Sequence, residues 1–249
     1  MFTRVTPAGR SMSVVLERSG AVFLHVPKTG GSWVRAALDA SGVPWREEGD
    51  KHLDHQATRS LSPGAPRFTV VRNPYEWYQS HWAMSRTRPC DFFPSSVVVS
   101  SDFLSFVRLA CRHYPGFLTS WYNRFAVPGV LILRNENLRN DLAAALRSLG
   151  EPFDEVLLAN TPAANVIGRQ ESWAARVLYT RDIAATLYRS EEPSFVRFQY
   201  PRNSITKYAA PHYRKRVAPR KPSRGNAKVK NNTKQHFGNW GWGLRRKAH

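Results

Sequence analysis

The stretch that decides the fold is Ala21–Trp33, AVFLHVPKTGGSW. It begins with the apolar run AVFL, passes through a Gly-rich segment and leads into a helical pattern at residues 34–38. This order predicts a buried strand, a short loop and a helix N-terminus. The first N–H groups of a helix have no partner within the helix, and its dipole favours negative charge there. The stretch therefore predicts a site for a phosphate-like anion.

The residue types in the loop fit such a site. Lys28 supplies a cation, while Thr29 and Ser32 supply hydroxyl donors. Gly30 and Gly31 allow the backbone to approach a ligand without a Cβ in the way. The alternative interpretation is an ordinary strand-to-helix turn with a lysine on the surface.

The position of Lys28 bears on which anion is bound. The common nucleoside-triphosphate loop reads G-x-x-x-x-G-K-[ST], with its lysine after the last glycine. Here Lys28 precedes Gly30 and Gly31, and the residue five positions before Gly30 is a histidine. A triphosphate loop is therefore a poor fit.

A second anion element lies in residues 68–82, FTVVRNPYEWYQSHW. Arg72 directly follows an expected strand, and Ser80 lies eight residues further on, inside an expected helix. A guanidinium is a planar fork that can hold a phosphate through two hydrogen bonds. Lys28 and Arg72 both follow strand ends, so both can face one crevice of a parallel sheet. Two anion elements suit a nucleotide with phosphate at its 5′ and 3′ positions, and ATP has no 3′-phosphate.

These two elements together resemble those of sulfotransferases that use 3′-phosphoadenosine 5′-phosphosulfate (PAPS). The segment PKTGGSW resembles the 5′-phosphosulfate loop of that family, and Arg72, Pro74 and Ser80 match its 3′-phosphate pattern R-x-P-x-x-R-x-x-S. Trp77 departs from the second Arg of the pattern. Residues 130–150 and 187–200 resemble later family segments. The likeness covers roughly residues 20–200 and is nearest to the carbohydrate sulfotransferase branch.

The resemblance implies an enzyme that moves a sulfuryl group from PAPS to a hydroxyl acceptor by in-line transfer, leaving PAP as product. The implied acceptor is a carbohydrate or another small molecule, and no metal is expected. The implied nucleotide-binding residues are Pro27, Lys28, Thr29, Gly30, Gly31, Ser32, Trp33, Arg72 and Ser80.

The alternation of strands and helices predicts an α/β fold: a three-layer sandwich with a central, mainly parallel sheet, similar to P-loop NTPases. Apolar periodicity predicts strands at residues 13–16, 21–26, 67–71 and 130–133. It predicts helices at residues 32–40, 75–85, 103–113, 140–149 and 171–189. We expect one domain over residues 1–200 and a basic C-terminal tail over residues 201–249, partly disordered or docked on the domain.

The acceptor hydroxyl must lose a proton during transfer, so a base with a pKa near neutrality is expected. The resemblance points to His52, which follows Lys51 between the two nucleotide elements. His55 lies three residues further on and would share a helical face with His52. Two solvent-exposed histidines, or a metal site with Asp54, remain alternatives. Glu47 and Glu48 are further candidate bases, His25 is expected to be structural, and Lys28 is expected to offset charge on the leaving phosphate.

Charge and composition leave two other functions open. The net charge is +19, and residues 201–249 hold 14 of the 37 Lys and Arg but none of the 18 acids. Such a segment can bind polyanions, so a nucleic-acid-binding or other polyanion-binding protein is one alternative. A small-molecule kinase is the other. Cys90 and Cys111 show no metal-type spacing. The chain has no signal-peptide pattern and no membrane-length apolar run, so a soluble cytoplasmic protein is expected.

Overall fold

The computed structural model describes residues 13–49, 52–86, 93, 102–163 and 177–202. Within these ranges the chain forms one five-stranded sheet with helices on both faces. The strands are β1 (Ser13–Leu16), β2 (Val22–Leu24), β3 (Trp45–Glu48), β4 (Arg67–Val71) and β5 (Val130–Arg134). The helices are α1 (Gly31–Ala40), α2 (His55–Leu61), α3 (Pro74–Ser85), α5 (Phe103–His113), α6 (Phe117–Phe125), η1 (Asn135–Asn137), α7 (Leu138–Ser148), α8 (Glu155–Asn160) and α10 (Arg181–Arg197).

The sheet has the strand order β3-β1-β2-β4-β5. The three strands β2, β4 and β5 run parallel, with Leu24 opposite Thr69 and Val71 opposite Arg134. The strands β1 and β3 extend the sheet antiparallel beyond β2. Because β2, β4 and β5 are parallel, their carboxyl ends lie along one edge of the sheet, and the segments that follow them meet there.

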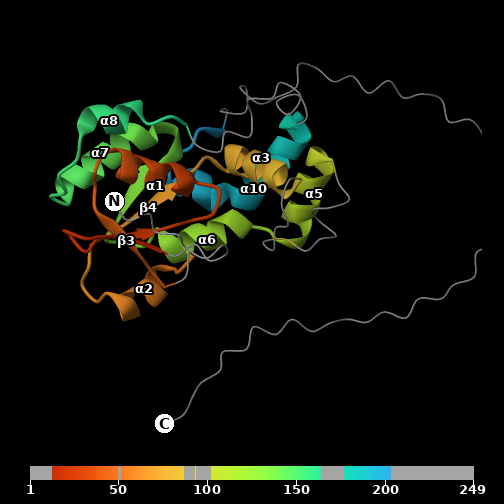
Figure 1. Cartoon of the computed structure of the whole chain (residues 1–249). Coiled ribbons are helices and arrows are strands. Elements are labelled where there is room, and N and C mark those ends of the chain that lie inside the picture. Colours follow the sequence, from red (N-terminus) through yellow and green to blue (C-terminus); the bar gives the residue numbers. More distant parts are fainter. Residues whose placement is uncertain (1–12, 50–51, 87–92, 94–101, 164–176, 203–249) are drawn as a thin grey trace, which may run out of the picture. The chain divides into compact units, whose positions relative to one another are not determined.

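Two hydrophobic cores lie on opposite faces of the sheet, which gives the three layers. One core joins the strands to α1, α7 and α8, and the other joins them to α3, α5, α6 and α10. Figure 1 shows α7 and α8 on one side of the sheet and α2 and α6 on the other. Successive residues of a strand face opposite sides, and accordingly Val14 and Val15 belong to different cores. The predicted α/β sandwich is confirmed.

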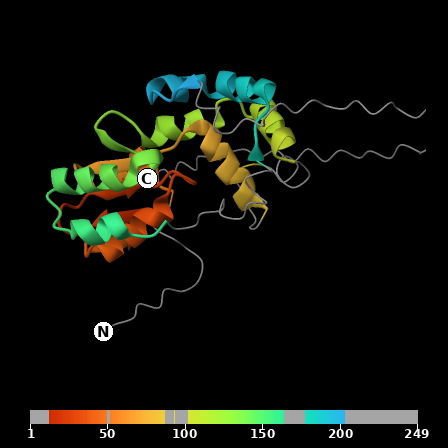
Figure 2. The same cartoon turned by 90° about the horizontal axis from the view of Figure 1, so that it is seen from above.

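The helices α3, α5 and α10 extend the second core beyond the sheet, as the view in Figure 2 shows. The buried carboxylate of Glu191, in α10, links α3 to α6. It accepts hydrogen bonds from the Tyr78 hydroxyl, the Leu118 and Thr119 backbone N–H groups and the Thr119 hydroxyl. Burial raises the pKa of Glu191. Its backbone is non-helical, two residues before Pro193, so α10 bends where the carboxylate binds the N-terminus of α6.

The predicted elements match closely where the apolar pattern is strong. The strands at 13–16 and 67–71 and the helix at 103–113 have the predicted bounds, while the β5 strand and the helices α1, α3 and α7 differ by one or two residues. The predicted helix at 171–189 begins later, at Arg181, and continues to Arg197; residues 171–176 lie outside the described part. The sequence reading missed β3, α2, α6 and α8. The predicted tail lies almost wholly outside the described residues, as does Cys90, while Cys111 is a buried free thiol.

Candidate anion-binding site

The loop between β2 and α1 has an unusual backbone. Lys28 adopts a positive φ of 66°, and Gly30, the N-cap of α1, has a φ of 103°. Left-handed backbone is easy for glycine, but it costs a residue with a Cβ on the order of 1 kcal/mol. The conformation at Lys28 therefore has to be held in place by its surroundings.

Five consecutive loop carbonyls are each in contact with a polar side-chain atom of the protein. The pairs are His25 O with His52 Nδ1 (3.0 Å), Val26 O with Thr29 Oγ1 (2.7 Å), Pro27 O with Trp77 Nε1 (2.7 Å), Lys28 O with Arg72 Nη1 (3.1 Å) and Thr29 O with Asn135 Nδ2 (2.9 Å). The next carbonyl, that of Gly30, accepts the backbone N–H groups of Trp33 and Val34. The acceptor groups of this loop are therefore used within the protein.

Four backbone donors at the end of the same loop are left for a ligand. A trans peptide directs its C=O and N–H in opposite directions, and no peptide in the described ranges is cis. The backbone N–H groups of Thr29, Gly30, Gly31 and Ser32 have no acceptor among the described residues. They lie at the N-terminus of α1, where the helix dipole adds positive potential. This arrangement is suited to binding an anion.

The two glycines are required by packing behind the loop. A Cβ on Gly30 would lie 2.8 Å from Asn135 Nδ2 and 2.9 Å from Leu138 Cδ2. A Cβ on Gly31 would overlap the imidazole of His25. His25 is buried and stacks on Phe23 at a ring-centroid distance of 5.5 Å. His25 therefore has the structural role expected for it, because its buried imidazole packs against Gly31 at the start of α1.

Arg72 lies beside this loop, directly after β4. Its backbone is held on both sides by the Tyr122 hydroxyl, which accepts from Arg72 N and donates to Arg72 O. Its guanidinium donates to Lys28 O and lies 3.5 Å from the carboxylate of Glu76, in the first turn of α3. The structure therefore brings together the two elements that the sequence placed on successive strand ends.

The other predicted nucleotide-binding residues differ in burial and in their hydrogen bonds. Ser80 lies two turns into α3 and, in the part of the chain that is described, shares no hydrogen bond with Arg72. Ser32 is exposed in the first turn of α1. The hydroxyl of Thr29 is buried on Val26 O, and Pro27 is buried. Trp33 is also buried, and its indole N–H donates to Thr161 O, so its ring belongs to the core.

His52 approaches the loop, and His55 does not share its contact. His52 Nδ1 lies 3.0 Å from the carbonyl of His25, and its ring lies 5.1 Å from the His25 ring. A carbonyl only accepts hydrogen bonds, so Nδ1 carries a proton, and in the neutral ring Nε2 is the nitrogen with the lone pair. His55 begins α2, after the N-cap Asp54, so the two histidines do not share a helix. Partial burial, followed by the charges of Arg67 and Arg59, lowers the pKa of His55.

The acids considered as bases, Glu47 and Glu48, and as a metal ligand, Asp54, have partners elsewhere. Glu47 lies 3.4 Å from Arg35, and Glu48 accepts from Arg46 at 2.9 Å. Asp54 caps α2 by accepting from Ala57 N. Within the described residues, no group of three or more His, Cys, Asp or Glu is arranged to hold a metal ion.

Sequence reasoning missed three residues that shape the site. Trp77 and Asn135 hold loop carbonyls, and buried His81 stacks on Trp77 at 4.9 Å. Burial, and next the charge of Lys28, lower the pKa of His81 to about 3, so its imidazole is neutral. Asn135 directly follows β5, the third parallel strand, so its position at a strand end was the available signal.

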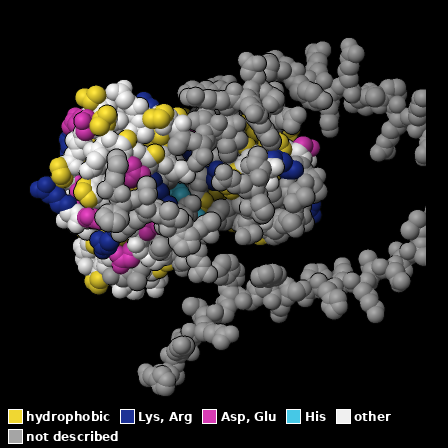
Figure 3. All heavy atoms as spheres, viewed as in Figure 1, with side chains coloured by type: hydrophobic (Ala, Val, Ile, Leu, Met, Phe, Trp, Pro, Cys, Tyr) yellow, Lys and Arg dark blue, Asp and Glu magenta, His cyan; other side chains and the backbone are white. Residues whose placement is uncertain are grey.

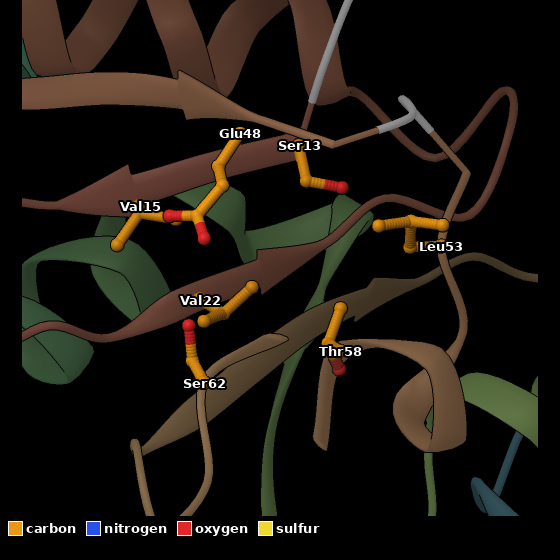
Figure 4. A pocket seen from close by; sticks show the side chains of 7 residues that line it. All are labelled: Ser13, Val15, Val22, Glu48, Leu53, Thr58 and Ser62. Atoms are coloured by element: carbon orange, nitrogen blue, oxygen red, sulfur yellow. The ribbon is translucent and has the colours of Figure 1, made fainter. Parts of the chain in front are cut away.

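The surface view and the small pocket of the structure concern different places. Figure 3 shows histidine side chains in a hollow near the centre of one face, with Lys or Arg nearby. A separate small pocket, with room for about one water molecule, is lined by Ser13, Val15, Val22, Glu48, Leu53, Thr58 and Ser62 (Figure 4). Glu48, one of the further candidate bases, lines it, but none of the predicted nucleotide-binding residues does, and it is too small for a nucleotide.

Comparison with known proteins gives one structural likeness. The chain is similar to the crystal structure of mouse sulfotransferase SULT7A1 complexed with PAP, with 15% identity and a TM-score of 0.44, over 78% of this chain and 91% of that chain. No protein-family model matches, and no curated protein matches. No described helix is both long and apolar enough to cross a membrane.

Proposed function

We propose that this protein is a sulfotransferase that moves a sulfuryl group from PAPS to a hydroxyl acceptor. The observation that carries the proposal is the loop in which the carbonyls of residues 25–30 are bound within the protein while the N–H groups of residues 29–32 are left for an anion. Arg72 contacts that same loop from the neighbouring strand. This pairing suits a ligand with two separate anionic groups.

The residues present fit the donor. Its 5′-phosphosulfate would be held by Lys28 and the N–H groups of residues 29–32. Its 3′-phosphate would be held by the Arg72 guanidinium and the Ser80 hydroxyl. These groups are donors and cations, as an anion requires. Because Arg72 also lies near the Glu76 carboxylate, a phosphate there would compete with Glu76 for part of the guanidinium.

The proposed chemistry is in-line substitution at sulfur. The acceptor oxygen forms a bond to sulfur as the bond from sulfur to the 5′-phosphate oxygen breaks, and PAP leaves. In the neutral imidazole of His52, Nδ1 donates to His25 O, so Nε2 is the nitrogen that takes the acceptor proton. Lys28 and the loop N–H groups stabilise the charge that develops on the leaving phosphate.

We further propose that the acceptor is a carbohydrate or another small molecule with a hydroxyl group. This part rests on the sequence resemblance to the carbohydrate sulfotransferase branch. Of the aromatic residues that could line an acceptor site, Trp82 and Tyr122 are core residues, while Trp121 is half-buried. The rings of Trp121 and His52 are perpendicular to each other, with their centroids 6.2 Å apart. The basic segment 201–249 is proposed as a separate region that can contact polyanions.

The test is a turnover assay with the full chain, PAPS and a panel of sugars, phenols and alcohols, in which PAP release is measured. We expect PAP release that depends on one class of acceptor and is lost in Lys28→Ala. A chain that leaves PAPS intact with every acceptor but consumes ATP would instead be a small-molecule kinase. Arg46→Ala, which removes an exposed cation on β3, is the control for loss of one positive charge.

A further inference from the structure

The indole of Trp77 lies directly behind the anion loop. Its side chain is buried, and its Nε1–H donates to Pro27 O at 2.7 Å, across 50 positions of sequence. The indole ring is itself held in place by aromatic neighbours. It stacks on His81 at 4.9 Å with an interplanar angle of 15°, and His81 in turn stacks on Phe106.

We propose that Trp77 is a positioning residue of the anion loop, which acts by holding the Pro27 carbonyl away from the bound anion. The inference rests on the proposed function only in that the loop binds an anion. The Pro27 carbonyl and the Lys28 N–H belong to one trans peptide. Fixing the carbonyl towards α3 therefore turns the N–H the opposite way and sets the entry into the left-handed conformation of Lys28.

The local backbone explains why such a donor is needed. Lys28 has a φ of 66°, which is unfavourable for a residue with a Cβ. Rotation of the peptide before Lys28 would relieve that strain and would also turn a carbonyl oxygen towards the anion. A hydrogen bond from a buried, stacked indole opposes this rotation, because breaking it would leave a buried N–H unpaired.

Asn135 makes the equivalent contact two residues further on. Its Nδ2 donates to Thr29 O at 2.9 Å and packs against Gly30, which also has a positive φ. Trp77 thus holds the peptide before the first left-handed residue, and Asn135 holds the peptide before the second. The two contacts come from different elements, α3 and η1, and act on the same short backbone segment.

The test compares two variants that each lose one indole N–H. Trp77→Phe keeps an aromatic ring against His81 but removes the donor to Pro27 O. Trp45→Phe removes the donor to Asp39 Oδ1, an exposed contact outside the site, and is the matched control. Binding of PAP and of inorganic pyrophosphate to the full chain is measured by calorimetry at physiological salt, well below each variant's melting temperature. Anion binding by the basic tail is common to all variants and cancels in the comparison.

We expect Trp77→Phe to weaken both ligands about tenfold, the effect of one lost hydrogen bond, while Trp45→Phe leaves both affinities unchanged. Unchanged affinities in Trp77→Phe, with or without a lower melting temperature, would reduce Trp77 to a packing residue and overturn the inference. If the wild-type chain binds pyrophosphate but not PAP, a selective loss in Trp77→Phe still supports the inference while the proposed function fails. If the wild-type chain binds neither ligand, both fail.

Discussion

His52 Nδ1 lies 3.0 Å from the carbonyl oxygen of His25, the first residue after β2. This contact fixes which ring nitrogen of His52 carries the proton, because the carbonyl can only accept. It also fixes the ring relative to the loop that holds the proposed phosphosulfate. A single backbone carbonyl thus places the candidate base and selects its basic nitrogen, Nε2.

His52→Ala is expected to lower the turnover number about a hundredfold or more, since a general base typically contributes that much. The Kd for PAP should change little, because the hydrogen bond of His52 to the loop is at the His25 carbonyl and not at residues 28–32. His113→Ala removes an exposed histidine of α5 and serves as the control. Steady-state kinetics with calorimetry check both quantities. Full turnover in His52→Ala, with a loss in His55→Ala, would transfer the role of base to His55.

Ser80→Ala is expected to weaken PAP about tenfold, since a hydrogen bond to a charged phosphate is lost, and to leave 5′-AMP binding unchanged. The two nucleotides differ at the 3′ position, so their ratio of affinities isolates the proposed 3′-phosphate contact. Ser85→Ala, later in the same helix, is the matched control, because its hydroxyl donates to Trp82 O. Equal losses for PAP and AMP would place Ser80 outside the 3′-phosphate site.

Gly31→Ala is expected to lower the free energy of unfolding by about 1–3 kcal/mol, the usual cost of overpacking, and to abolish PAP binding. The added Cβ overlaps the His25 imidazole, and relief of the overlap must shift the start of α1. Urea unfolding checks the first part and calorimetry checks the second.

The matching experiment is the double variant Gly31→Ala with His25→Ala. If the imidazole is the obstacle, the double variant should lose less unfolding free energy than the two single variants added together. The difference should be about 1 kcal/mol or more. Additive losses would show that the clash at His25 is not the cause.

The stability of the protein should fall on acidification because of His81. Its folded-state pKa is lowered to about 3, first by burial and then by Lys28, whereas an unfolded histidine titrates near 6.5. Between these values the unfolded chain binds the extra proton, so the contribution is complete above about pH 6.5 and is lost as the pH falls towards 3. At pH 5 the loss from this residue alone is about 2 kcal/mol.

The comparison that isolates His81 is His81→Phe, which keeps a ring between Trp77 and Phe106. Urea unfolding is followed from pH 7.5 to pH 5 for both proteins. As the pH falls over this range, the wild-type chain should lose about 2 kcal/mol more of its free energy of unfolding than the variant. Parallel pH profiles for the two proteins would mean that His81 is not held neutral.

The sequence predicted the elements whose signals are local. The apolar run that forms β4 and the periodic pattern that forms α5 gave the observed bounds. The strand β3, with the sequence WREE, has no apolar alternation, and it exists because it pairs with β1 along four residues. The short helix α2 is begun by Asp54, which is a local cap signal, but seven residues carry little periodicity.

The candidate site could be predicted only in part for a related reason. The loop and Arg72 come directly after strands, so their position at one sheet edge followed from the order of elements. The donors that orient the loop could not be predicted in this way, because Trp77 lies 50 positions from Pro27 and Asn135 lies 106 positions from Thr29. Such pairings depend on tertiary packing. The sequence marks Trp77 only as a replacement of the second Arg in the pattern R-x-P-x-x-R-x-x-S, although its indole makes one of the closest contacts to the loop.

The most direct test of the central claim is a calorimetric titration of the full chain with PAP, 5′-AMP and ATP at physiological salt. A loop that offers only donors, with Arg72 beside it for a second phosphate, predicts that PAP binds at least about tenfold more tightly than AMP or ATP, and that Lys28→Ala weakens PAP strongly. Binding of ATP as tight as that of PAP, or PAP binding that survives Lys28→Ala unchanged, would contradict the account.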